Sequence, residues 1–338
     1  MELTGQIVAM SFFGGEPLYQ VLLILAALFI GLYNALWKEP VMVMGGKRLI
    51  FLRSLFVLGL VLPYSLYAGF SSFEIELTWQ SLSFRALILI FLFSYPGLYF
   101  FVKATKSGPS SVVVPVSSSI AVVIPVLVHA LYFHDMEFHL LSYLGIGLLI
   151  AGMLLLKFRH ASGKLIYMGD AGFRFSFLSA LLMGSVFTAS EMIFVSAGPS
   201  VTLLTQEGSV LIFSFLHIVF SRYLGRMKKA KGNPVPFRWS ADQMKNHWKQ
   251  YALIIGVIGV LSGISVVFRM ISNQAPLPMA TFILSFSSLI TVLAAQLYYG
   301  ENLKPQQKLA VFFLIAGIFI IAWIGDGQLR GMESLFRE

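Results

Sequence analysis

Two carboxylates inside apolar segments are the residues of this sequence best suited to chemistry. Glu191 and Glu207 each lie in a long apolar run, close to the Gly198-Pro199 turn that separates the two runs. An ionisable group in such a run is costly to bury, and a function is therefore expected for it. We expect both to line an outer vestibule. There, each either binds a proton or a cationic ligand group, or simply reaches interfacial water or a basic partner.

Basic side chains near the ends of other apolar runs are the complementary candidates. Arg53 lies just inside one run, and Lys38 and Lys103 close two others. A guanidinium can bind a substrate carboxylate or phosphate through two hydrogen bonds. The same residue types also extend to lipid headgroups and fix membrane topology, so both interpretations stay open. His129, in a further run, is either a hydrogen-bonded core histidine or part of a proton relay.

Uncharged polar side chains inside the runs could shape a binding pocket. Serines cluster around Ser119 and around Ser285, in two runs that occupy corresponding places in the chain. Small hydroxylated residues serve helix packing in lipid as readily as they contact a ligand. Asn34 and Tyr95 add an amide and a ring suited to an aromatic or amphipathic ligand. Rings that face lipid are equally consistent with a chain in which 14% of the residues are aromatic.

The densest group of possible metal ligands consists of His134, Asp135, Glu137 and His139. A solvated turn carries such residues without any metal, and ligand spacing without a second cluster is a weak signal, so we expect no metal. The cluster leaves one alternative function open, an integral membrane enzyme that modifies lipids with His134, Asp135 and His139 as acid and base. A membrane scaffold without turnover is the third interpretation.

The composition places all these residues in a membrane protein. Of 338 residues, 57% are hydrophobic and only 12% are charged, and the mean hydropathy is +0.82. Soluble proteins carry about 25% charged residues. Without any Cys, the chain forms no disulfide, thiolate metal site or cysteine nucleophile. The sequence has no glycine-rich phosphate loop, so we expect neither ATP-driven transport nor a cofactor. The N-terminus lacks the basic leader of a signal peptide, and Met1 is expected to be retained.

Ten apolar runs predict ten transmembrane helices and an all-α fold, because a helix needs about 20 apolar residues to cross a bilayer. Turn and charge signals such as Lys106-Ser107-Gly108-Pro109 separate them. The basic segment 222–249 is expected to be a loop between the seventh and eighth helices. The expected helices cover residues 18–37, 50–69, 86–102, 109–132, 140–156, 175–196, 201–221, 251–268, 275–299 and 309–325.

An internal duplication is the most informative feature of the sequence. Leu148–Gly152 reads LLIAG and Phe313–Gly317 reads FLIAG, at an offset of 165 residues. Earlier in the same pair of copies, an offset of 166 pairs Ser119 with Ser285. The repeat unit is therefore five helices. The two repeats are expected to cover residues 18–157 and 173–325.

A smaller offset relates the beginnings of the two copies. It is 153 residues, and it pairs Gly31 with Gly184 and Arg53 with Gln206. The change of offset falls where the basic segment 222–249 has no equally long counterpart. An odd number of helices per copy makes the second copy enter the membrane from the opposite side. Such inverted repeats build secondary transporters with a site between the halves, near the bilayer midplane.

The duplicated stretches Lys103–Gly152 and Arg269–Gly317 resemble the drug/metabolite transporter superfamily, specifically its ten-helix EamA-like branch. The second copy, with Gly300-Glu301-Asn302, is most similar to the family pattern, and the first departs from it at His134-Asp135. The resemblance implies a plasma (inner) membrane exporter of amino acids, related metabolites or drugs, and no enzyme. It also implies a cavity among helices one, three, four, six, eight and nine. Within that cavity we expect Glu191 to be the leading site of proton coupling or ligand charge.

The distribution of charge predicts the orientation. Most of the 24 Lys and Arg residues fall in odd-numbered loops, which the positive-inside rule places in the cytoplasm, so both termini face outside. The family resemblance implies the opposite orientation, and we follow the charges. The net charge of +9 is assigned to these loops and not to nucleic acid. The expected partners are a small-molecule substrate, protons and membrane lipids, for a monomer or homodimer.

Overall fold

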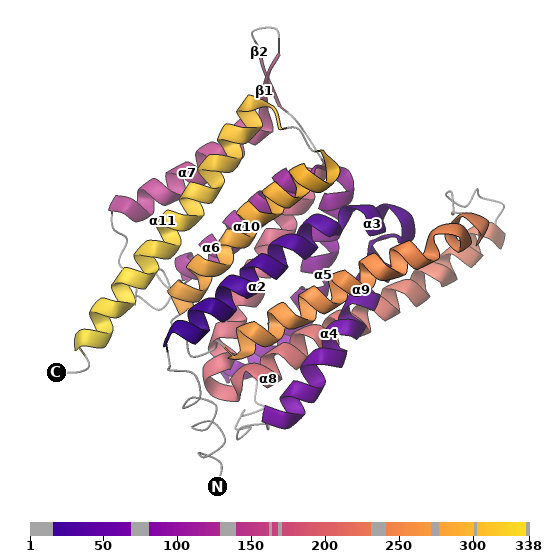
Figure 1. The fold of residues 1–338 in the computed structure, drawn as a ribbon, viewed down its shortest axis with the longest axis horizontal. Helices are drawn as coiled ribbons and strands as arrows, with labels where there is room; N and C mark the ends of the chain where they lie inside the picture. Colours follow the sequence, from indigo (N-terminus) through magenta and orange to yellow (C-terminus); the bar gives the residue numbers. More distant parts are fainter. Residues whose placement is uncertain are drawn as a thin grey trace.

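The computed structural model describes residues 16–68, 81–128, 140–161, 164–167, 171–230, 241–271, 277–300 and 303–335. The described chain is a bundle of long helices (Figure 1). The helices are α2 (Glu16–Leu36), α3 (Lys38–Met44), α4 (Gly46–Ala68), α5 (Leu82–Ser107), α6 (Ser110–Val128), α7 (Leu140–Lys157), α8 (Ala171–Ala230), α9 (Ala241–Ile271), α10 (Leu277–Tyr299) and α11 (Pro305–Leu335).

Several helices are long and apolar enough to cross a membrane. Four qualify within the described residues, and α2 with α3 makes a fifth if this pair, bent by 42°, is one span. Large apolar side chains also cover the outside of the bundle, among them Leu297 at 88% and Leu253 at 70% exposure. A water-soluble surface avoids such patches, so the chain is a multi-pass membrane protein. The four helical segments are Gly46–Leu66, Leu82–Ser107, Ala171–Ser190 and Ser200–Leu224.

The apolar runs of the sequence coincide with the described helices, and the turn at Gly198 lies inside α8. Gly198 has φ 76° and ψ 169°, so α8 is two helices joined at a sharp break. Only glycine adopts a positive φ at little steric cost. The runs 175–196 and 201–221 occupy the two sides of this break.

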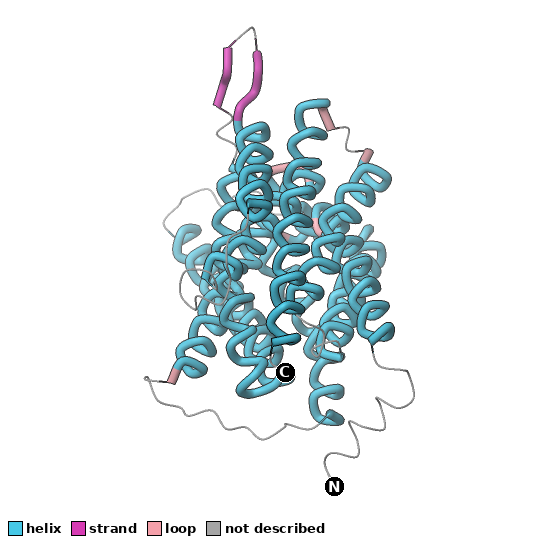
Figure 2. The backbone as a smooth tube through the Cα atoms, turned by 90° about the vertical axis from the view of Figure 1, so that its left-hand side faces the viewer, coloured by secondary structure: helices cyan, strands magenta, loops and turns pink. Residues whose placement is uncertain are grey.

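The connecting segments 158–167 and 222–249 carry more regular structure than expected from the sequence. The segment 222–249 is not a loop along its whole length, because α8 continues to Ala230 and α9 starts at Ala241. Lys, Arg, Met and Ala are good helix formers, and a helix that leaves the bilayer can continue in water. The described fold is all-helical, as expected, apart from one short hairpin. Strands β1 (Phe158–Ala161) and β2 (Lys164–Tyr167) pair antiparallel and project from one end of the bundle (Figure 2).

Helices α7 and α11 approach each other through glycines (Figure 1). A Cβ added to Gly152 would lie 2.8 Å from the carbonyl oxygen of Ala310, and one added to Gly317 would lie 2.7 Å from that of Gly145. The two contacts are reciprocal, since Ala310 follows Gly145 by the same 165 residues that separate Gly317 from Gly152. Each helix therefore offers the same glycine-lined face to the other.

A second pair of glycine contacts is likewise related by the offsets of the duplicated sequence. A Cβ at Gly31 of α2 would lie 2.5 Å from the Cβ of Ile290 in α10, and one at Gly184 of α8 would lie 2.5 Å from the Cδ1 of Ile124 in α6. The glycines are 153 residues apart and the isoleucines 166, which are the two offsets of the duplicated sequence. Small residues of this kind let helix backbones approach closely in lipid.

We expect Gly152→Ala to destabilise the protein by about 1–3 kcal/mol, the usual cost of overpacking a tight contact. The matched control is Gly147→Ala on the same helix, where an added Cβ would meet no atom within 4 Å. The measurement is thermal unfolding of both variants in detergent. Equal unfolding temperatures for the two variants would contradict the close approach of α7 and α11.

Candidate functional site

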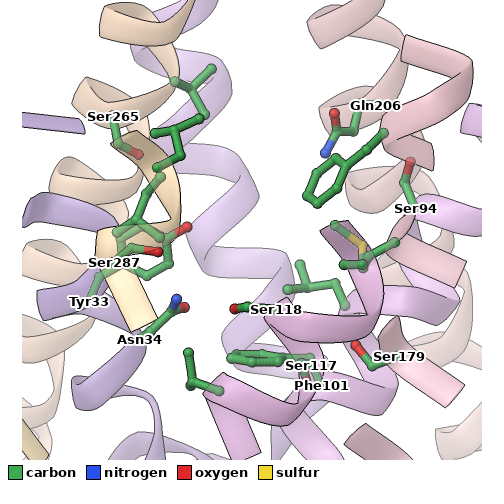
Figure 3. A pocket seen from close by; sticks show the side chains of 18 of the residues that line it. Tyr33, Asn34, Ser94, Phe101, Ser117, Ser118, Ser179, Gln206, Ser265 and Ser287 are labelled. Carbon is green, nitrogen blue, oxygen red and sulfur yellow. The ribbon is translucent and has the colours of Figure 1, made fainter. Parts of the chain in front are cut away.

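An internal cavity of about 280 Å³ lies among α2, α4, α5, α6, α8, α9 and α10. In Figure 3, Tyr33, Asn34, Ser265 and Ser287 gather on one side, and Ser94, Ser179 and Gln206 lie opposite. The helices that the sequence assigns to a cavity all contribute to the wall, and α4 and the second half of α8 join them. The polar lining consists of Tyr33, Asn34, Trp37, Arg53, Ser94, Ser117, Ser118, Ser179, Gln206, Glu207, Ser265 and Ser287.

Arg53 and Glu207 form a buried ion pair in the wall of this cavity. Nη1 of Arg53, on α4, donates to Oε2 of Glu207 in the second half of α8. Nε of Arg53 donates to Oγ of Ser262 on α9 at 2.8 Å, and the hydroxyl of Ser54 approaches the same Glu207 oxygen at 3.4 Å. Arg53 is 7% exposed and Glu207 2% exposed. One salt bridge with its hydrogen bonds thus joins α4, α8 and α9.

This pair favours one of the alternatives that the sequence left open for each residue, since Glu207 has a basic partner and Arg53 is turned inward. Arg53 does not extend to lipid headgroups, and Glu207 does not line an outer vestibule. The helix rotations turn both side chains toward the interior, where a single charge would be costly to bury and an opposite charge with additional hydrogen bonds offsets much of that cost. The sequence offered both residues as candidates, and the structure joins them in one site.

Tyr95 lies beside the cavity and not in its wall. Its hydroxyl is 2.5 Å from Nδ1 of His217, and the His217 ring packs edge-on against Tyr99 with 5.0 Å between ring centroids. These rings form a seam between α5 and the second half of α8. His217 was missed at the sequence level, although it is an ionisable residue in an apolar run, which is the signal that identified Glu207.

The serines of the cavity present mainly acceptor oxygens. The hydroxyls of Ser94, Ser179 and Ser265 donate to the backbone oxygens of Ile90, Gly97 and Ser262 at 2.5, 2.8 and 2.7 Å. A hydroxyl has one proton and two lone pairs, so each oxygen can still accept a hydrogen bond. A ligand with N–H or O–H donors would therefore find partners on this wall.

Not all serine candidates of the sequence lie in the described wall. The hydroxyl of Ser119 donates to the backbone oxygen of Val116 at 2.9 Å and is buried in helix packing. Its neighbours Ser117 and Ser118 line the cavity in its place. One residue along an α-helix turns a side chain by about 100°, which separates these roles. Ser285 belongs to α10, and its side chain lies outside the described part.

The structure shows where some of the remaining candidate side chains lie, and others fall outside the part of the chain that it describes. Asn34 lines the cavity. Lys38 follows the break between α2 and α3, outside the cavity wall, with its Nζ 5.6 Å from the centroid of the Tyr299 ring. Glu191 lies in α8, but its side chain is outside the described part. His129 and the His134–His139 cluster also lie outside the described residues.

Trp37 and Gln206 line the cavity, and sequence reasoning did not select either as a site residue. Trp37 is fully buried, and its indole Nε1 has no hydrogen-bond partner among the described residues. A tryptophan at the end of an apolar run gives no sequence signal of its own. Gln206 did have a sequence signal, because it is the counterpart of Arg53 in the duplicated sequence.

Comparison with known proteins gives partial similarity. No family model matches the chain. Over 71 residues, 21% of the chain, it is 37% identical to the probable 4-amino-4-deoxy-L-arabinose-phosphoundecaprenol flippase subunit ArnE of Yersinia pseudotuberculosis serotype O:1b (strain IP 31758). It is 35% identical to the protein of the same name from Yersinia pestis (strain Pestoides F). The match spans 61% of the length of each relative.

The fold is similar to that of a protein solved by crystallography. The TM-score is 0.58 at 13% sequence identity, over 89% of this chain and 95% of the other. This likeness concerns the fold alone. The similarity to ArnE covers a fifth of this chain and less than two thirds of a protein that is named as a flippase subunit.

Removal of one charge of the buried pair should cost more stability than removal of both. We expect Glu207→Gln to destabilise the protein by about 3–5 kcal/mol, because it leaves the Arg53 charge buried without a partner. The double variant Arg53→Gln with Glu207→Gln should be more stable than either single variant. Thermal unfolding in detergent measures all three.

Glu39→Gln serves as control, because Glu39 is partly exposed and, among the described residues, its one hydrogen bond is a long 3.5 Å contact from the hydroxyl of Tyr298. Its effect should stay within about 0.5 kcal/mol, as is usual for surface substitutions. If the loss of unfolding free energy in the double variant equalled the sum of the losses in the two single variants, Arg53 and Glu207 would not be energetically coupled.

Proposed function

We propose that this chain is a secondary transporter of small organic metabolites, which works by alternating access without ATP hydrolysis. The observation that carries the proposal is the polar cavity with a buried Arg53–Glu207 pair inside an apolar bundle. Ionisable groups inside membrane helices are rare and costly, and they usually face a substrate or ion pathway. A role in helix packing alone would need neither a cavity nor charges in its wall.

The proposal includes ten transmembrane helices in two inverted repeats. The reciprocal glycine contacts support this architecture, because a two-fold relation between halves requires that if one position contacts another, their counterparts do so too. The contact between Ser54 and Glu207, two positions 153 residues apart, supports it as well. Counterparts that touch lie next to the symmetry axis. In an inverted repeat this axis lies in the membrane plane, which puts the ion pair near the midplane.

The similarity to ArnE supports movement of a substrate across a bilayer, since that relative is named as a flippase subunit. A cavity of about 280 Å³ suits a free small molecule, because pockets for drug-sized ligands begin at about 300 Å³. We further propose export as the direction, with the odd-numbered loops in the cytoplasm and Glu191 as the site of proton coupling.

Counterflow in liposomes tests the proposal. Vesicles that contain the purified protein are loaded with unlabelled amino acids, nucleosides, sugar phosphates or organic cations, one class at a time, and diluted into a trace of labelled compound of the same class. We expect one class to accumulate transiently in the absence of ATP, because exchange through a carrier concentrates the tracer.

Protein-free vesicles are the control for leakage, and the double variant Arg53→Gln with Glu207→Gln is the control for the site. This variant should lose the accumulation. Passive equilibration of all four classes, or accumulation that the double variant retains, would contradict a carrier that uses this cavity.

A further inference from the structure

We propose that the cavity binds a zwitterion, with the ligand's anionic group at Arg53 and its cationic group at Glu207. This inference rests on the proposed transport function and names its substrate class. It depends on three features of the cavity, which are its charge balance, the hydrogen-bonding capacity left on the ion pair, and the indole nitrogen of Trp37.

The first feature is the charge balance of the cavity. Among the described residues of its wall, Arg53 is the one cation and Glu207 the one acid, so the described wall is neutral overall. A ligand with a net charge would bring that charge into an apolar bundle without compensation, at high cost. A zwitterion carries no net charge, and each of its ends finds an opposite charge in the wall.

The second feature is the bonding capacity that the ion pair retains. Arg53 has five N–H groups, and its contacts within the described chain engage Nε and Nη1. Both hydrogen bonds of Glu207 with described residues are at Oε2, so Oε1 is left to accept from a ligand. The rest of the guanidinium suits a carboxylate, and the free carboxylate oxygen suits an ammonium group. Arg53 can thus bind the ligand's anionic group and Glu207 its cationic group while the salt bridge between them stays intact.

The third feature is a buried donor without a partner. The indole Nε1 of Trp37 lies in a fully buried side chain of the cavity wall and makes no hydrogen bond with any residue that the structure describes. Buried polar groups are nearly always hydrogen-bonded, and an orphan donor therefore calls for a partner. A ligand carboxylate has lone pairs enough to accept from both Arg53 and Trp37. The apolar side chains of Leu98, Met183 and Phe187 would then surround the ligand's hydrocarbon part.

Ligand-induced thermal stabilisation of the purified protein tests this proposal. Four probes are compared. L-leucine is a zwitterion, 4-methylpentanoate is its skeleton without the amine, 3-methylbutylamine is its skeleton without the carboxylate, and ribitol is a neutral polyol. Binding to the folded state raises the unfolding temperature by mass action. We expect L-leucine to bind at least about 10-fold more tightly than the other three, because each of them leaves a charge of the pair or of the ligand unmatched.

Two single-charge variants should reverse the order of the probes. Glu207→Gln leaves a positive wall, so 4-methylpentanoate should become the best ligand and restore part of the lost stability. Arg53→Gln leaves a negative wall, so 3-methylbutylamine should become the best ligand. If either variant fails to fold, Trp37→Phe gives an independent reading. It removes the indole donor, and it should weaken L-leucine and 4-methylpentanoate binding several-fold while leaving 3-methylbutylamine unchanged.

The outcomes separate this inference from the transport proposal. Equal binding of the four probes, an unchanged order of probes in the folded charge variants, or no binding of L-leucine would overturn the zwitterion assignment. Saturable binding of ribitol alone would do so while the transport proposal stands. The transport proposal is tested separately by the counterflow experiment, in which four classes of compound are tried.

Discussion

A positive and a negative charge inside an apolar bundle are stable only when they meet, and this requirement organises the centre of the molecule. Arg53 on α4 and Glu207 on α8 meet there, and Ser262 on α9 adds a hydrogen bond. The cost of an unpaired buried charge fixes how these three helices are rotated relative to one another. The cavity lies against the same pair, so the polar wall and the helix arrangement depend on one interaction.

Glycine contacts around this centre set how closely the other helices approach. Gly31 and Gly184 bring α2 to α10 and α8 to α6, and Gly152 and Gly317 bring α7 to α11. Each of these contacts joins a helix of one predicted half to a helix of the other. Small residues let these backbones approach closely, so the two predicted halves meet along tightly packed seams, and a relative rotation of the halves would take place along them. On the proposed mechanism, such a rotation opens the cavity to one side and then to the other.

Much of this could be predicted from the sequence, because apolar runs and turn residues act locally. The helices, the break at Gly198 and the candidacy of Arg53 and Glu207 follow from composition and from the cost of intramembrane charge. The pairing of the two residues could not be predicted. They are 154 positions apart in the chain, and their contact depends on how their helices cross and rotate. The same limit explains why Ser119 was selected where Ser117 and Ser118 line the cavity, and why Trp37 was missed.

The most direct test of the account is the accessibility of the cavity from the two sides of a membrane. The chain has no Cys, so a single Ser118→Cys in the cavity wall can be labelled in vesicles with an impermeant maleimide added outside or trapped inside. Leu293→Cys, on an exposed apolar surface, is the control. Alternating access predicts that the cavity cysteine is labelled from both sides and the control from neither. Labelling of the cavity cysteine from only one side, or as slowly as the control, would contradict alternating access.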